Sequence, residues 1–169
     1  APGTYVARHG AALCLPCPAG HFCADGWALD GDGLLVRTQS MGGLIPLPTR
    51  CPAGTYSAEL GNDSPEDCVA CPPGSVAPLP GGDSADACEP CAPGHSQPHP
   101  GMPACHICVA SQAQPLAGQP HCDVCAPGKY ASAAGATECL DCLPGSHQPR
   151  EAGSDPACKA CPAGTFSAQ

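Results

Sequence analysis

The chain has 169 residues, of which 16 are cysteine, 21 glycine and 23 proline, and it holds one tryptophan, three tyrosines and two phenylalanines. About one cysteine in ten residues is typical of a disulfide scaffold, and so few large apolar side chains argue against one shared hydrophobic core. The formal net charge is −9 with only six lysines and arginines, which excludes a basic surface for a nucleic-acid partner. The sequence contains no transmembrane run, so we expect membrane contact only through regions outside this segment.

Residues 1–23 are predicted to be a partial cysteine-rich repeat that is truncated at its start. The first five residues, Ala-Pro-Gly-Thr-Tyr, match the Ala-Pro-Gly-Lys-Tyr that follows Cys125. A cysteine is therefore expected just before residue 1, and Cys14 would pair with a cysteine beyond that end. We accordingly expect the chain to be part of a longer repeat array.

Residues 24–50 are predicted to form a non-repeat insertion, because they contain no cysteine dyad. They hold the only tryptophan, Trp27, together with Arg37 and two apolar clusters. Tryptophan and arginine are enriched among the residues that dominate protein interfaces, so Trp27 and Arg37 are candidate partner contacts. The run Asp30-Gly31-Asp32-Gly33 could suggest calcium, but it lacks the spaced third ligand and the distal glutamate of an EF-hand, which favours a turn.

Residues 51–161 are predicted to be tandem repeats, since C-x-x-C dyads recur along them. Most cysteines that close a dyad are the first residue of a motif C-P-A-G, C-P-P-G, C-A-P-G or C-L-P-G. Cys108 instead begins the sequence C-V-A-S. Proline presets φ and glycine removes the steric limit, so each repeat should begin with a tight turn. Cys161 opens one more repeat, and residues 162–169 are predicted to be its truncated start.

A second glycine follows each turn at a nearly fixed distance and precedes a loop of variable length. We assign this glycine to the tenth residue after the opening cysteine in four repeats and to the eleventh in two. The glycines are Gly61, Gly101, Gly118 and Gly135 at the tenth position, and Gly82 and Gly153 at the eleventh.

The dyads have the spacing of zinc sites as well as of disulfides. Seven dyads do not divide evenly into four-cysteine sites, and no helix-forming segment separates them, so we favour disulfides and expect no metal or other cofactor. Zinc remains the rival interpretation.

Connectivity cannot be deduced from spacing alone. The simplest ladder joins the second cysteine of each dyad to the first of the next, and each bridge would stabilise the fold by around 3 kcal/mol. The remaining cysteines then form one local pair, and Cys14 and Cys161 stay unpaired within the segment. The ladder is Cys51–Cys68, Cys71–Cys88, Cys91–Cys105, Cys108–Cys122, Cys125–Cys139 and Cys142–Cys158, with Cys17–Cys23 as the local pair.

The only asparagine, Asn62, begins the sequon Asn62-Asp63-Ser64. It lies in the variable loop before Cys68, where we expect an exposed position that could carry a surface glycan, although Pro65 lowers the efficiency of such a sequon. Asn62 is therefore a candidate N-glycosylation site, and we expect a glycoprotein.

The pattern C-x-x-C-P-x-G-x-Y, seen most clearly from residue 51 to residue 74, resembles the cysteine-rich repeats of ephrin-receptor-like and tumour-necrosis-factor-receptor-like extracellular proteins. The resemblance covers nearly all of the chain outside roughly residues 24–50. It implies a small disulfide-rich repeat array, an elongated rod of short β/turn modules with little regular secondary structure, located outside the cell or at its surface. The ladder given above is similar to that family's one-bridge submodule.

No catalytic constellation is present: G-x-S-x-G, H-E-x-x-H and glycine-rich phosphate loops are all missing. We predict that the chain is not an enzyme and has no small-molecule substrate. It could be a structural segment of a larger cell-surface or filament glycoprotein, such as a mastigoneme-like appendage of a cilium or flagellum. Its partners would be other copies or other extracellular proteins of the assembly, and each repeat would touch only its neighbours. The alternative is a receptor ectodomain that binds a protein ligand through residues 24–50.

Overall fold

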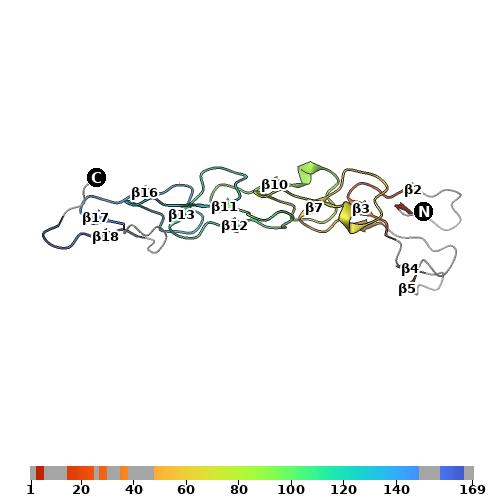
Figure 1. The fold of residues 1–169 in the computed structure, drawn as a ribbon, viewed down its shortest axis with the longest axis horizontal. Coiled ribbons are helices and arrows are strands. Elements are labelled where there is room, and N and C mark those ends of the chain that lie inside the picture. Colours follow the sequence, from red (N-terminus) through yellow and green to blue (C-terminus); the bar gives the residue numbers. More distant parts are fainter. Residues whose placement is uncertain are drawn as a thin grey trace. The chain divides into compact units, whose positions relative to one another are not determined.

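The computed structural model describes residues 3–5, 15–24, 27–29, 35–37, 48–148 and 157–165, with the backbone alone for 27–29 and 35–37 (Figure 1). Over these ranges the regular elements are strands of two or three residues and two short 3₁₀ helices, with no α-helix. Frequent proline explains this, because proline removes a backbone donor and blocks helix propagation. The architecture confirms the predicted class, a disulfide-rich array of short β/turn modules with little regular secondary structure.

The strands are joined two by two into small sheets, and in most of them the second strand lies between the two cysteines of a dyad. The sheets are β1 (Thr4–Tyr5) with β2 (Leu15–Pro16), β3 (His21–Phe22) with β6 (Thr49–Arg50), β4 (Trp27–Leu29) with β5 (Leu35–Arg37), β7 (Thr55–Tyr56) with β8 (Val69–Ala70), β9 (Ser75–Val76) with β10 (Glu89–Pro90), β11 (His95–Ser96) with β12 (His106–Ile107), β13 (Gln112–Ala113) with β14 (Asp123–Val124), β15 (Lys129–Tyr130) with β16 (Leu140–Asp141), and β17 (Ser146–His147) with β18 (Lys159–Ala160).

We name each module by the cysteine that opens it. In the Cys51 module the N–H of Thr55 donates to the carbonyl of Pro52 at 3.1 Å, which closes a four-residue turn. The third residue of that turn is Gly54, with φ at +88°. This left-handed conformation costs glycine nothing because it has no Cβ, which explains the glycine of the turn motif. We call the residue at this position the turn glycine.

The loops that follow the turns differ in length, as the sequence predicted. The Cys51 and Cys71 modules have the longer loops, which contain the 3₁₀ helices η1 (Pro65–Asp67) and η2 (Ala85–Ala87). The three modules from Cys91 to Cys125 close with cysteines 14 residues apart, against 17 in the two longer ones. Length variation is therefore confined to the part of each module that precedes its second strand.

The buried side chains are mainly sulfur and small groups. Among the described residues the buried apolar side chains are seven cysteines, three alanines and Val76. Such a core supplies little hydrophobic stabilisation, so covalent bridges and backbone hydrogen bonds must hold the modules in place. The buried cysteines are Cys17, Cys23, Cys51, Cys71, Cys91, Cys108 and Cys125.

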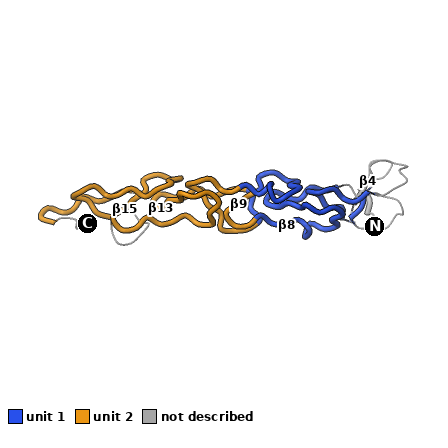
Figure 2. Tube along the Cα trace, turned by 90° about the horizontal axis from the view of Figure 1, so that it is seen from above, with its two compact units in different colours: residues 1–71, 77–89, 101–103 blue, residues 72–76, 90–100, 104–169 orange. Residues whose placement is uncertain are grey.

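The chain divides into two compact units, which Figure 2 shows in blue and orange. Unit 1 comprises residues 1–71, 77–89 and 101–103, and unit 2 comprises residues 72–76, 90–100 and 104–169. The division does not fall at one point of the sequence, because short segments between residues 72 and 103 alternate between the units.

The predicted insertion begins and ends within a module. Strand β3 follows the turn of the Cys17 module and pairs antiparallel with β6, where His21 lies opposite Arg50. Strand β6 directly precedes Cys51, as the second strand of every complete module directly precedes an opening cysteine. The two residues of β6 therefore pair as the second strand of a module does, although they lie within the predicted range 24–50. The predicted domain division stays a prediction.

Candidate functional site

The structure contains seven disulfides within the described residues, and they join the same pairs as the ladder given above. Their Cα–Cα separations of 5.5–5.8 Å lie within the range that disulfides occupy. The bridges are Cys17–Cys23, Cys51–Cys68, Cys71–Cys88, Cys91–Cys105, Cys108–Cys122, Cys125–Cys139 and Cys142–Cys158.

Cys161 is free and partly exposed, and its Sγ lies 4.0 Å from Nδ1 of His147. Cys14, the other cysteine predicted to be unpaired, lies outside the described residues. Within those residues no three His, Cys, Asp or Glu side chains are grouped so that they could hold a metal ion. Nor does that part of the chain contain a helix long and apolar enough to cross a membrane.

Adjacent modules are joined by a repeating set of four backbone hydrogen bonds. Positions in a module are counted from the residue after its opening cysteine. The N–H of an opening cysteine donates to the carbonyl of the turn glycine in the earlier module, and the N–H of that glycine donates to the sixth residue of the later module. The sixth residue of the earlier module donates to the eleventh residue of the later module, and the tenth residue of the later module donates to the opening cysteine of the earlier one. Between the Cys91 and Cys108 modules these bonds are Cys108 to Gly94 (2.8 Å), Gly94 to Gln114 (2.7 Å), Gln97 to Gln119 (3.2 Å) and Gly118 to Cys91 (2.8 Å).

The same four bonds recur at the other complete junctions of each unit. Between the Cys51 and Cys71 modules, the N–H of Gly81 donates to the carbonyl of Cys51 at 2.8 Å, and φ of Gly81 is +91°. The sequence pattern assigns the repeated glycine of this module to Gly82; the structure gives that role to Gly81, the tenth residue after Cys71, because Gly81 makes the junction bond. Gly82 accepts from the N–H of Ser57 at 3.0 Å and so holds the eleventh position. Gly153, the other glycine assigned to the eleventh position, lies outside the described residues.

The Cys108 module keeps this geometry without a turn glycine. Ser111 stands in its place with φ at +71° and is the only non-glycine residue with positive φ in the part of the chain that the structure describes. Its N–H donates to Ala131 at 2.8 Å, and its carbonyl accepts from Cys125 at 3.0 Å. Both bonds match those of the turn glycines, so the junction holds serine in a conformation that side chains disfavour.

Several turn glycines, Gly20 and Gly94 among them, also contact the module that lies two places further along the chain. A Cβ built on Gly20 would lie 2.5 Å from the carbonyl oxygen of Gly81, and one on Gly94 would overlap with the carbonyl oxygen of Gly135. No side chain fits at such positions. The expectation that each repeat touches only its neighbours is therefore wrong, since contacts within each unit reach two modules along.

Two buried glutamines close the loops of two of the three shorter modules, those of Cys91 and Cys108. Gln97 is fully buried; its Nε2 donates to the carbonyl of Ala104 at 2.7 Å and its Oε1 accepts from the N–H of His99 at 3.1 Å. Gln114 does the same one module later, with His121 at 2.8 Å and Leu116 at 3.1 Å. Each amide ties the start of a loop to the residue before the bridging cysteine. The sequence displays the recurring Gln-Pro pair, but nothing in it gives this role.

Asn62 is not at the surface. Its residue is 7% exposed, and its Nδ2 donates to Oγ of Ser57 at 2.6 Å. The expected exposed position of the sequon is therefore wrong, because the side chain turns inward to the junction between the Cys17 and Cys51 modules.

The two candidate partner contacts are brought together by β4 and β5. Their antiparallel register places Trp27 opposite Arg37, so the backbone sets them as a cross-strand pair at one end of the small sheet. The Asp30-Gly31-Asp32-Gly33 run lies outside the described residues.

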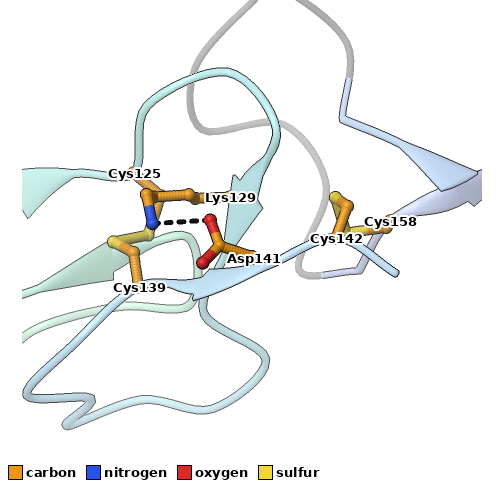
Figure 3. A network of polar contacts seen from close by, with 6 residues as sticks. All are labelled: Cys125, Lys129, Cys139, Asp141, Cys142 and Cys158. Carbon is orange, nitrogen blue, oxygen red and sulfur yellow. Dashed lines mark hydrogen bonds and ion pairs between the residues drawn. A yellow bond between two sulfur atoms is a disulfide. The ribbon is translucent and has the colours of Figure 1, made fainter. Parts of the chain in front are cut away.

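An ion pair on β15 and β16 lies beside two bridges of the ladder. Nζ of Lys129 is 2.6 Å from Oδ1 of Asp141, its partner across the strands, near the Cys125–Cys139 and Cys142–Cys158 disulfides (Figure 3). Both side chains are largely exposed, so the pair contributes little to stability.

Residues 128–169 match a family model described as tyrosine-protein kinase ephrin type A/B receptor-like. The chain carries ephrin-receptor-like cysteine-rich repeats. A search of curated proteins found no match. Ephrin-receptor-like modules held by disulfides indicate an extracellular domain, and modules of this family are typically non-catalytic.

Proposed function

We propose that the chain is a structural segment of a larger extracellular protein, in which the ephrin-receptor-like modules act as a stiff spacer. The observation that carries this proposal is the four-bond junction, repeated between modules within each unit and backed by one disulfide per module. Each junction has four backbone hydrogen bonds, and turn glycines such as Gly94 also contact the module two places further along the chain. Together these contacts resist bending at a junction far better than a flexible linker would.

Assembly with other copies would use exposed aliphatic side chains. They protrude from several modules, among them Leu79, Leu116 and Leu143, which are 62–76% exposed. In this proposal such side chains make the lateral contacts between segments, each contact weak but repeated along the array. A mastigoneme-like filament or another cell-surface appendage would use contacts of this kind.

Lateral self-assembly of the purified chain tests the proposal. We expect concentration-dependent association in sedimentation velocity, which the double substitution Leu79→Ser and Leu143→Ser weakens while all seven disulfides persist. Exchanging two exposed polar residues, Ser132→Ala and Thr137→Ala, serves as the control and should leave association unchanged. A chain that stays monomeric at the highest soluble concentration would count against the assembly role.

A receptor ectodomain is the second candidate, favoured by the Trp27–Arg37 cross-strand pair. Under this proposal the β4–β5 hairpin contacts a protein ligand. Replacing residues 24–47 by a short Gly-Ser linker keeps β3 and β6, and should abolish binding of the labelled segment to cells that retain the intact chain. Equal binding by both forms would remove the hairpin as the contact surface.

A further inference from the structure

The side-chain amide of Asn62 is enclosed by acceptors. Besides the bond to Oγ of Ser57, its Nδ2 lies 3.3 Å from the carbonyl oxygens of His21 and Glu59. His21 belongs to the Cys17 module, 41 residues earlier in the sequence. The amide therefore links two modules as well as the start of its own loop.

The backbone of the same residue lies in the junction set. The carbonyl of Asn62 accepts from the N–H of Cys23 at 2.9 Å, and the N–H of Gly61 donates to the carbonyl of Cys17 at 2.8 Å. These two hydrogen bonds are among the four that join the Cys17 and Cys51 modules. Any displacement of Asn62 towards solvent would break these bonds together.

Hydrogen bonds also fix the other two sequon residues, Asp63 and Ser64. Oγ of Ser64 accepts from the N–H of Glu66 at 3.3 Å, and Oδ2 of Asp67 accepts from the N–H groups of Asp63 and Ser64 at 3.0 and 3.1 Å. These bonds form a capping box at the start of η1. The sequon is thus folded into a turn with its acceptor amide facing inward.

We propose that glycosylation of Asn62 and closure of the Cys17–Cys51 junction exclude each other, so that the folded protein keeps Asn62 unmodified as a tether between the two modules. Transfer from a lipid-pyrophosphate-linked oligosaccharide would form a bond between the anomeric carbon and Nδ2, which loses one proton as the lipid pyrophosphate leaves. One N–H would then face three acceptors, and the sugar would have to occupy space that protein atoms fill. The loss of hydrogen bonds to a buried amide is costly, so the modified chain cannot close the junction.

The first test is the occupancy of the sequon in chain secreted by a glycosylating host. In the fraction with all seven disulfides formed, we expect no change in mass at the peptide containing Asn62 after treatment with an amidase that removes N-glycans. A glycan at Asn62 in that fraction would overturn the proposal.

The second test separates the tether from the sequon. Ser64→Gly removes the sequon but leaves Asn62, and glycine replaces a capping serine at little cost. Asn62→Gln removes both the sequon and the fitted amide. We expect hydrogen exchange at the amides of Cys23 and Gly61 to speed up about tenfold or more in Asn62→Gln and to stay near the parent rate in Ser64→Gly. Equal protection in the two variants would overturn the tether role.

Discussion

The Cys91 and Cys108 modules follow each other in unit 2 and differ in the one motif that defines the repeat. The first opens with C-A-P-G and the second with C-V-A-S, yet Gly94 and Ser111 have φ of +77° and +71° and make equivalent junction bonds. The disulfide and the four backbone hydrogen bonds therefore set the left-handed conformation of the turn, and glycine is preferred there because it adopts that conformation without strain. Glycine becomes indispensable where another carbonyl occupies the space of a side chain, as Gly135 does beside Gly94.

The largest expected effect comes from filling that space. Gly94→Ala should lower the free energy of unfolding by about 3–5 kcal/mol, because it adds a clash with Gly135 to the cost of a left-handed alanine. Gly128→Ala is the matched control: φ is +81° and no described atom lies within 4 Å of its added Cβ. Its cost should be about 1–2 kcal/mol, measured by urea unfolding under oxidising conditions. Equal costs at the two positions would show that the contact two modules along contributes nothing.

The next effect concerns the buried amides that the two modules share. Gln114→Ala should cost about 2–3 kcal/mol, because it leaves the carbonyl of His121 and the N–H of Leu116 without their partner. Gln119→Ala serves as control, since its Nε2 makes only an exposed 3.3 Å contact with Ala117, and it should change stability by less than about 0.5 kcal/mol. Chemical denaturation of both variants gives the comparison, and a loss below about 1 kcal/mol in Gln114→Ala would contradict the loop-closing role.

Relieving the backbone strain at Ser111 in the Cys108 module should have a smaller effect on stability, and one of opposite sign. Ser111→Gly is expected to be more stable than Ser111→Ala by about 0.5–1 kcal/mol, because both variants lack the hydroxyl and only glycine adopts φ near +70° without the Cβ penalty. Ser111→Ala keeps the strain and should bring no gain. Thermal unfolding of both variants decides the matter: an alanine variant as stable as the glycine variant would mean that the backbone conformation is not what limits this module.

The smallest effect is expected at the ion pair of β15 and β16. Lys129→Ala should change the free energy of unfolding by at most about 1 kcal/mol, and raising the salt concentration should shrink the difference, because both groups are largely exposed. A double-mutant cycle with Asp141→Asn isolates the pair. A coupling energy that persists at high salt would show that the pair is more enclosed than its exposure indicates.

The sequence predicted the architecture because its main constraint is covalent and local. Dyads, turn motifs and loop lengths are all visible along the chain, and the simplest ladder contains the same pairs as the structure. The class of fold followed from the cysteine content and the lack of large apolar residues.

What sequence could not supply depends on contacts between modules. Gly81 and Gly82 are adjacent glycines, and only the bond to Cys51 shows which one holds the tenth position. From the sequence, Asn62 is interpreted as a surface sequon. Only the structure shows that the carbonyl of His21, 41 residues away, lies against its amide. The place of β6 in the repeat became visible only through its pairing with β3, because Pro48 stands where a dyad would begin.

Disulfide mapping of the unreduced, secreted chain by proteolysis and mass spectrometry tests the ladder of one bridge per module most directly. We expect one bridge per module, with Cys91 linked to Cys105 and Cys108 to Cys122 in the two modules compared above. A peptide that links Cys108 to any cysteine other than Cys122, or full reactivity of the dyads with thiol reagents after zinc is removed, would contradict the ladder.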